Sequence, residues 1–437
     1  MTDFQYARLF ALRNWISIVA AFGFFKTASP AAAQDNSMTN APDDSYTNSI
    51  TEKKPLELRI GPFDLHPRLV TGLTYDDNIL FSTANAEADA IWTVQPALQV
   101  VAGDDAALIA YRDQGYDVLN LSPGSIIIQR PEVWPGKLFI LDYGPRFQIF
   151  EKYTGNNSID QLGTLNLLWP MSKLILGFRQ DLQFQETTLI EAGQRTQVQS
   201  ITTALSAAYQ FGDKASLESN FRRASVSYDQ PGLVGDTEYN TEDWFNYELE
   251  EDLPVSLGVL AGLDDVANNQ DQTFEQLRLR ARYSYTEKLA FDVSGGGELR
   301  QYEDGSPQTF SPVFSIAGTY HPAERTALTL TGYRQQYASD FNGYNYASTG
   351  ATLGVQQGIT DRFTASLSLS YYILDYTPLA AALVKYTDDY YTARIGLEAK
   401  IIKHLTGQVF YQWISEQSEV GGDIRDNQAG VRMTLSF

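Results

Sequence analysis

The chain has 437 residues, no cysteine, three histidines and a formal net charge of -21 at pH 7. It therefore has neither disulfides nor thiolate metal sites, and its acidity argues against a nucleic-acid partner, because phosphate binding needs a basic surface. No apolar run reaches the roughly 20 residues that a membrane-spanning helix needs. The 26 Tyr and 23 Phe residues are spread along the chain, which favours many β-strands over one compact core.

The N-terminal residues 1–33 have the pattern of a secretory signal peptide. Arg8 and Arg13 give a positive start, and the apolar run that follows is too short to cross a bilayer. Small residues lead up to the expected cleavage site, which we place between Ala33 and Gln34. An amphipathic N-terminal anchor is the alternative. The signal predicts export from the cytoplasm of a double-membrane bacterium.

Three further segments are predicted from composition and pattern. Residues 34–60, rich in Asn, Asp, Ser, Thr and Pro, are expected to be a disordered periplasmic leader. Residues 61–437 are expected to form one β-barrel. Within it, residues 103–136 break the strand rhythm with a cluster of Pro, Trp and Gly, and proline is confined to strand edges. We predict a periplasmic insert there; a further hairpin is the alternative.

The barrel region alternates with a period of two residues. Odd-numbered positions from Phe363 to Ile373 are apolar, whereas even-numbered positions from Arg362 to Ser370 are polar. The segments 201–211, 277–285 and 429–437 repeat this pattern. Strand side chains point alternately to opposite faces, so each segment is expected to present one apolar face and one polar face.

Short and long connections also alternate along the chain. Short turns fall near 170–172, 212–213, 286–288, 321–324 and 358–361, and longer polar loops lie between them. This asymmetry is typical of outer-membrane barrels. We predict an all-β, transmembrane, antiparallel up-and-down β-barrel of about 18 strands, with 16 or 20 as alternatives. A soluble sandwich or propeller is the competing fold, but no repeat of propeller length is present.

Two motifs resemble known outer-membrane proteins. The chain ends on an alternating strand with Phe437, which resembles the terminal signature read by the barrel-assembly machinery. The segments 61–67 (GPFDLHP) and 75–79 (YDDNI) resemble a family of β-barrel porins often encoded with exopolysaccharide export genes. This resemblance covers residues 61–437, apart from the insert, and implies an outer-membrane location without a defined substrate.

Enzyme chemistry is not expected. The three imidazoles, His66, His321 and His404, fall at predicted periplasmic strand ends, so no Ser/His site is expected. Asp76 and Asp77 are interpreted as the start of a loop, because calcium needs more oxygens than one short run supplies. No metal and no cofactor are predicted.

The polar strand face is the candidate functional surface, because barrels of this size leave an aqueous channel. Charged side chains in a lumen set pore selectivity, or else pair across strands and only solvate the wall. Positions expected to face inward are Arg146, Arg179, Arg222, Arg278, Arg280, Arg282, Arg300, Arg394, Arg432, Asp292 and Glu298. Of these, the candidate solute-binding residues are Arg222, Arg278, Arg280, Arg282, Arg300 and Asp292.

Three arginines alternate with apolar residues in the segment 277–285. They must face the lumen, because an arginine near the lipid midplane costs roughly 2–4 kcal/mol. If Tyr285 pairs with Leu289, the expected partners in the next strand are Asp292 for Arg282, Ser294 for Arg280 and Gly296 for Arg278. On the other side the neighbours are small: Ser256, Gly258 and Gly262.

Arg278 and Arg280 are therefore expected to lack an adjacent carboxylate, and to have room to extend toward sugar carboxylates or phosphates. The alternative is that an acidic loop folds inward and neutralises them.

The sequence predicts a passive outer-membrane channel for small hydrophilic or polyanionic solutes, with a link to exopolysaccharide as a further hypothesis. The alternative function is a structural or interaction barrel with a plugged lumen and ligand-binding loops. Expected partners are outer-membrane lipid, the barrel-assembly machinery, and polysaccharide or small solutes, with no nucleic acid.

Overall fold

The computed structural model describes residues 58–103, 136–189, 194–250, 253–267, 270–286, 288–303, 307–379 and 382–437. The predicted signal peptide, most of the predicted leader and nearly all of the predicted insert at 103–136 lie outside the described residues. The last three leader residues, Leu58–Ile60, form a short strand, β1, which pairs with the start of the barrel.

The described residues form one antiparallel sheet of 20 strands. Their bounds are β1 Leu58–Ile60, β2 Phe63–Asp76, β3 Asp89–Gly103, β4 Leu138–Tyr143, β5 Arg146–Phe150, β6 Ser158–Pro170, β7 Leu174–Leu189, β8 Gln194–Gln210, β9 Ala215–Tyr228, β10 Asp236–Glu250, β11 Leu253–Val266, β12 Gln272–Thr286, β13 Leu289–Tyr302, β14 Thr309–Ala323, β15 Thr326–Ala338, β16 Tyr344–Gly358, β17 Phe363–Pro378, β18 Tyr386–Ile402, β19 Leu405–Ser418 and β20 Ile424–Ser436. A 3-10 turn, η3, covers Thr154–Asn156.

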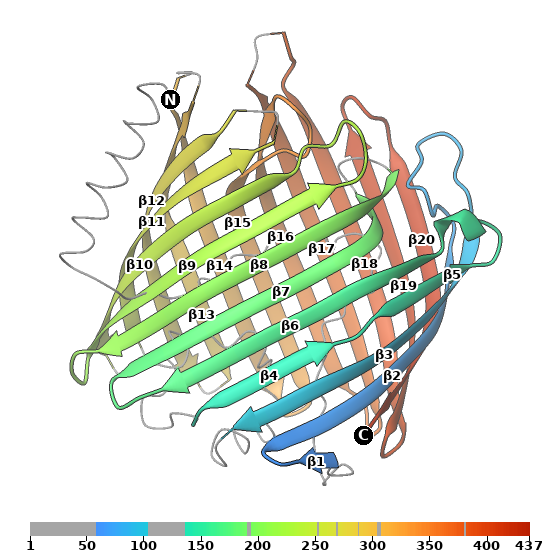
Figure 1. The fold of residues 1–437 in the computed structure, drawn as a ribbon, viewed down its shortest axis with the longest axis horizontal. Helices are drawn as coiled ribbons and strands as arrows, with labels where there is room; N and C mark the ends of the chain where they lie inside the picture. The colour runs from blue at the N-terminus through green and yellow to red at the C-terminus, as the bar shows by residue number, and fades with distance from the viewer. Residues whose placement is uncertain are drawn as a thin grey trace.

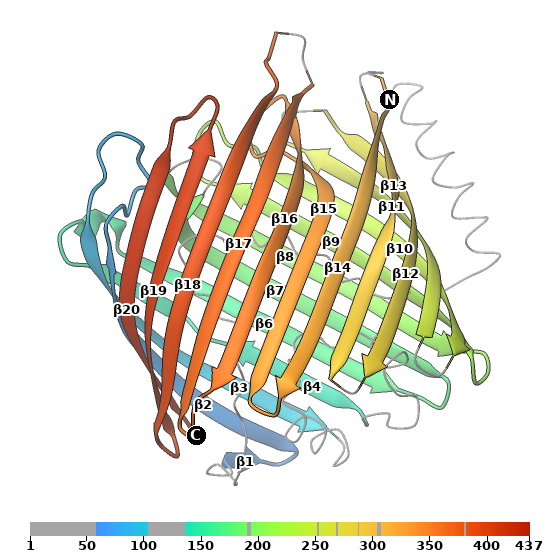
Figure 2. The same cartoon turned by 180° about the vertical axis from the view of Figure 1, so that it is seen from behind.

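The sheet closes into a barrel because the first long strand pairs with the last. β2 pairs with β20 from Arg68↔Ser436 to Asp76↔Gln428, and Figures 1 and 2 show the continuous wall from both sides. β4 and β5 both lie between β3 and β6 and together make one interrupted wall strand. β1 pairs only with β2 and is not part of the closed wall. With β1 left out and β4 and β5 counted as one, the wall has 18 strands, which confirms the predicted fold.

The two faces of the wall differ in polarity, as the period-two pattern predicted. Large apolar side chains point outward and are exposed, among them Trp92, Leu205, Leu279 and Ile395. Polar side chains of the same strands point inward, and many are buried. A closed barrel with an apolar outer surface matches lipid, because all wall hydrogen bonds are made between strands. Within the described residues, no helix is long and apolar enough to cross a membrane.

The connections have the predicted asymmetry. Turns at the end that carries the C-terminus, such as 171–173 and 211–214, are tight, whereas loops at the other end are longer, such as 77–88 and 379–385. At the C-terminal end, the backbone N–H of Phe437 donates to Pro67 O at 3.1 Å, and its ring stacks on His404 at 5.5 Å. The last residue is thus held at the seam between the first and last strands.

This arrangement predicts which loops face outward in intact cells. The chain has no cysteine, so Pro231→Cys and Asn342→Cys each introduce one thiol in the long loops, and Asp213→Cys introduces one in a short turn. A membrane-impermeant maleimide should label the first two variants in whole cells and label Asp213→Cys only after lysis. Labelling of Asp213→Cys from outside would contradict the topology.

Candidate functional site

The three arginines of β12 lie where the pattern predicted. Arg282 pairs with Asp292, Arg280 with Ser294 and Arg278 with Gly296, while the intervening Leu277 and Leu279 are exposed on the outer face. The turn differs in detail, because Leu289 pairs with Thr286 and a bulge follows Ser284. The bulge adds one residue and thereby restores the predicted register.

The residues opposite Arg278 and Arg280 on the adjacent strands carry no carboxylate, as predicted, but the expectation that both arginines are free to reach a solute is wrong. Arg280 Nη2 lies 2.8 Å from Glu218 Oε2, and Arg278 Nη1 lies 3.6 Å from Glu242 Oε1. The two acids stand on β9 and β10 and are not direct neighbours of β12. Ser256 and Gly258 on β11 were interpreted as space for a solute. Because their side chains are small, both guanidinium groups can instead extend across β11 to these acids.

Trp244 completes this arginine cluster. Its side chain on β10 is fully buried, and its ring lies 4.4 Å from the Arg280 guanidinium and 5.8 Å from that of Arg278. Gly258 makes room for the indole, because a Cβ there would lie 2.4 Å from a ring carbon. Removing one partner of a buried ion pair costs about 3–5 kcal/mol. A passing anion is therefore a poor competitor for these arginines.

Ion pairing extends to most of the other lumen arginines, whereas Arg394 Nη1 donates to Gln412 Oε1 at 3.0 Å. Arg222 contacts Glu238 at 2.9 Å and Arg282 contacts Asp292 at 2.7 Å. Further pairs join Arg68 to Asp142, Arg146 to Asp160, Arg179 to Asp181, and Arg195 to Glu186. Of the two alternatives for a charged lumen, pairing across strands is the one that the geometry supports.

The upper part of the β15–β16 hairpin folds into the lumen. Pairing between β14 and β15 ends at Phe314↔Arg334, whereas β15 and β16 stay paired to Ala338↔Asn345. Asn345 has the same register as the lipid-facing Leu353, yet its side chain bonds Gln272, on the inner face of β12. The outer face of this tip therefore packs against the inner wall of the barrel.

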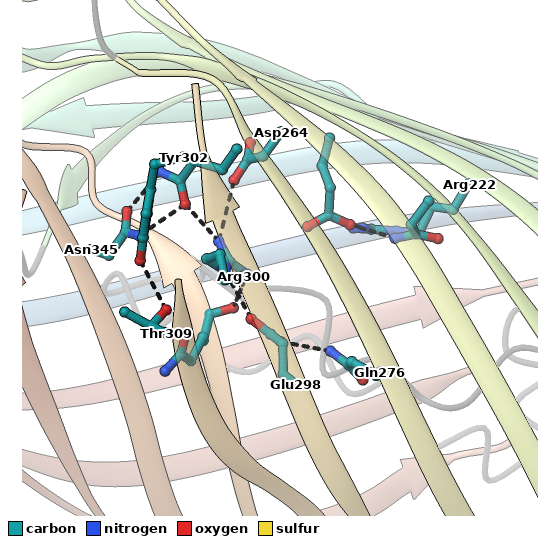
Figure 3. A network of polar contacts seen from close by, with 12 residues as sticks. Arg222, Asp264, Gln276, Glu298, Arg300, Tyr302, Thr309 and Asn345 are labelled. Carbon is teal, nitrogen blue, oxygen red and sulfur yellow. Dashed lines mark hydrogen bonds and ion pairs between the residues drawn. The ribbon is translucent and has the colours of Figure 1, made fainter. Parts of the chain in front are cut away.

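Arg300 fastens this tip to the wall, as Figure 3 shows. Its guanidinium, 2% exposed, donates to Glu298 Oε1 at 2.8 Å, to Gln272 Oε1 at 3.0 Å and to the backbone oxygen of Gln336 at 3.3 Å. Gln272 and Asn345 each donate to the other's side-chain oxygen at 2.8 Å. In this conformation Arg300 is a structural clasp rather than an exposed solute ligand.

The loops above the wall also meet. Residues 229–235, between β9 and β10, contact residues 339–343, between β15 and β16. Leu233 and Phe341 form an antiparallel bridge, and the N–H of Val234 donates to Asp340 O at 2.8 Å. These loops belong to hairpins that are not neighbours in the wall, so together they form a strap over one sector of the mouth.

Tyrosines fill the lumen side of β16 to β18. The rings of Tyr372 and Tyr390 stack at 4.8 Å, and those of Tyr376 and Tyr386 at 4.3 Å. Tyr346 packs on Tyr376 at 5.4 Å. Sequence reasoning missed this cluster, although its signal was present: each tyrosine stands at the upper end of its strand on the polar register. The cluster narrows the lumen further.

Asp76 and Asp77 stand where β2 ends and the first long loop begins. Asp76 Oδ1 accepts a bond from the backbone N–H of Asn78 at 2.8 Å, and Asp77 Oδ1 accepts one from Asn427 at 2.7 Å. These bonds agree with the interpretation of Asp76 and Asp77 as the start of a loop. In the part of the chain that the structure describes, no group of three or more His, Asp or Glu side chains is placed to hold a metal ion.

No family model matches the chain. No curated protein matches it either. Similar solved structures include Pseudomonas aeruginosa OpdQ, at 9% identity and a TM-score of 0.45 over 86% of this chain and 98% of that one. OpdK from the same species, solved with vanillate, has 12% identity and a TM-score of 0.44 over 86% of this chain and 99% of that one. An anion-selective porin from Comamonas acidovorans has 9% identity and a TM-score of 0.39 over 86% of this chain and 99% of that one. At these values the likeness carries no argument about the function of this chain.

The strap predicts a specific cross-link. Residues facing each other in an antiparallel bridge have Cα atoms about 4.5–5.5 Å apart, within the range that a disulfide needs. In this cysteine-free chain, Leu233→Cys with Phe341→Cys should form a disulfide under mild oxidation, seen as a faster band on non-reducing gels of the unfolded protein. The pair Leu233→Cys with Val384→Cys, in another loop, serves as the control. Equal cross-linking in both pairs would contradict a fixed strap.

Proposed function

We propose that this chain is a passive outer-membrane channel for small hydrophilic solutes. The observation that carries the proposal is a closed 18-strand barrel with an apolar outside and a polar inside. Barrels of 16 to 18 strands have an interior wide enough for an aqueous channel. The expected lipid partner follows from the outer surface, and outer-membrane location follows from the barrel type together with the sequence pattern of a secretory signal.

The lumen chemistry favours small uncharged or weakly charged solutes over polyanions. A polyanion path needs cations that are available to the solute, and most of the described lumen arginines, including Arg146, Arg222, Arg278 and Arg280, are held by carboxylates of the wall. The infolded β15–β16 tip and the tyrosine cluster also reduce the open cross-section. A link to exopolysaccharide rests on the short motifs at 61–67 and 75–79 alone.

A barrel with a plugged lumen is the second candidate function. The strap between Leu233 and Phe341 and the Arg300 clasp favour it, because both fix polypeptide across the lumen. In that case the long loops would bind a partner and no solute would cross. Both candidate functions require the barrel to reach the outer membrane. Cleavage after Ala33 and recognition of Phe437 by the assembly machinery are therefore proposed for either one.

Reversal potentials across a salt gradient in planar bilayers test the channel. Because most of the described lumen arginines are paired with carboxylates, we expect the wild type to conduct without a preference for anions. Glu218→Gln removes the partner of Arg280 and should shift the channel toward anion preference. Glu275→Gln, on the outer face of β12, is the matched control and should leave the potential unchanged.

A strongly anion-selective wild type would contradict charge compensation in the lumen. A correctly folded barrel that does not conduct would replace the channel with the plugged alternative.

A further inference from the structure

A second hairpin tip folds inward on another sector of the barrel. β6 and β7 stay paired up to Gln161↔Phe184, whereas β7 and β8 continue to Leu189↔Gln194. Arg195, on the outward register of β8, reaches back to the lumen face of β5 and β6. It donates to Gln148 Oε1 at 3.4 Å and to Ser158 Oγ at 3.3 Å. A cavity lies beside this tip.

The cavity lies between the β7–β8 tip and the wall formed by β20, β2, β3 and β5, which are neighbours in Figure 1. Its volume is about 60 Å³. One ordered water needs roughly 10–15 Å³, so the space admits several waters or the edge of one small ring. The side chains that line it include Gln95, Gln148, Gln428, Arg146, Arg195 and Phe150.

The charges that face this cavity are compensated. Arg146 Nε lies 2.8 Å from Asp160 Oδ2, and Arg195 Nε lies 3.2 Å from Glu186 Oε1. On the opposite wall, Arg432 and Asp76 line different parts of the space, four residues apart along the paired strands β2 and β20. Because Arg146 and Arg195 are already paired, neither offers an uncompensated positive charge to an anion. Its guanidinium groups act as directional hydrogen-bond donors that are already held in place.

Side-chain amides supply the remaining polar surface. Gln95, 3% exposed, makes a long bond of 3.4 Å to Gly144 O, and Gln428 Nε2 donates to Asp76 Oδ2 at 3.1 Å. Gln148 Nε2 donates to Asp160 Oδ2 at 2.8 Å. Gln428 Nε2 also donates to Asp426 Oδ2 at 2.9 Å, so Gln428 can only accept from a solute, whereas the amides of Gln95 and Gln148 carry both donors and an acceptor and can serve a hydroxyl in either direction. Hydroxyl-rich solutes are the ones that need such two-way partners.

Apolar surface lies next to these amides. Phe150 is almost completely buried, with the Arg195 guanidinium 4.7 Å from its ring, and Ile79, Ile91 and Phe410 line the same space. Binding sites that fix small molecules combine an apolar lining with a few placed polar groups. A sugar ring or polyol presents both C–H faces and hydroxyl edges, and therefore matches this lining.

We infer that this cavity is a binding site for a neutral polyhydroxylated solute, a sugar ring or small polyol, on its way through the barrel. The inference rests on the proposed channel function and names its substrate class. It assigns recognition to Gln95 and Gln148 on the wall and to Arg195 on the infolded tip. The occluded β15–β16 sector leaves the β2–β8 side as the path.

Glucose is the test solute, with glucuronate and sulfate as the anionic comparisons. Purified full-length barrel is placed in a planar bilayer, and interruption of the ionic current is recorded against solute concentration. We expect glucose to interrupt the current more strongly than glucuronate or sulfate. The double variant Gln95→Leu with Gln148→Leu should raise the half-blocking glucose concentration at least tenfold. Gln183→Leu, an exposed glutamine of β7 that does not line the cavity, should leave it unchanged.

Calorimetric titration of glucose into the detergent-folded barrel separates the two ideas. If the barrel does not conduct but binds glucose, and the double variant does not, the channel fails and the site stands. If the barrel conducts normally but glucose neither binds nor blocks, the site is overturned and the channel stands. Tighter block by glucuronate or sulfate would overturn the assignment to neutral solutes. Equal glucose block in the double variant and the wild type would remove the site from this cavity.

Discussion

A wall in lipid must pair its backbone groups within itself, and the rest of this structure depends on that constraint. It forces the sheet to close through β2 and β20, and it fixes the alternation of apolar and polar residues along every wall strand. It is relaxed at two seams, above Phe314↔Arg334 and above Gln161↔Phe184, where a hairpin tip leaves the wall. In both places side chains take over the contacts, with Gln272 and Asn345 at one seam and Arg195 at the other. The two infolded tips then divide the lumen into an occluded sector and a sector with a cavity.

The inner surface follows from a second constraint, the cost of burying charge. A lumen narrowed by infolded tips and tyrosines has less water to solvate guanidinium groups, so each arginine needs a carboxylate. Most partners stand on the same or the adjacent strand, but where the adjacent strand carries only small residues, as for Arg278 and Arg280, the arginine reaches a carboxylate two or three strands away. This pairing holds the guanidinium groups against the wall and takes away their attraction for anions. Selection among solutes then depends on the positions of hydrogen-bond donors and acceptors, which the amide side chains of the cavity supply.

Much of the fold could be predicted from the sequence, because period-two alternation reports directly on the two environments of a wall strand. The strand order, the lumen position of Arg278 and Arg280, and the register opposite Ser294 all follow from it. The infolding could not be predicted, because a tip that packs its outer face on the inner wall keeps the same alternation as a lipid-facing one. The partners Glu218 and Glu242 were missed for a related reason: pattern analysis compares adjacent strands, whereas arginine reaches beyond them. The roles of the segments at 1–57 and 104–135 lie outside the described residues.

The central claim is that two infolded hairpin tips narrow an 18-strand barrel to a small passage on the β2–β8 side. Exclusion of neutral polymers from the pore tests it most directly. Polyethylene glycols of graded size are added to a conducting bilayer, and a polymer that enters the pore lowers its conductance. The smallest polymer that no longer lowers the conductance gives the pore radius. The account predicts that only the smallest polymers enter, and that cutting the clasp with Arg300→Ala raises the cutoff. Entry of large polymers into the wild-type pore, as expected for an unobstructed barrel of this strand number, would contradict it.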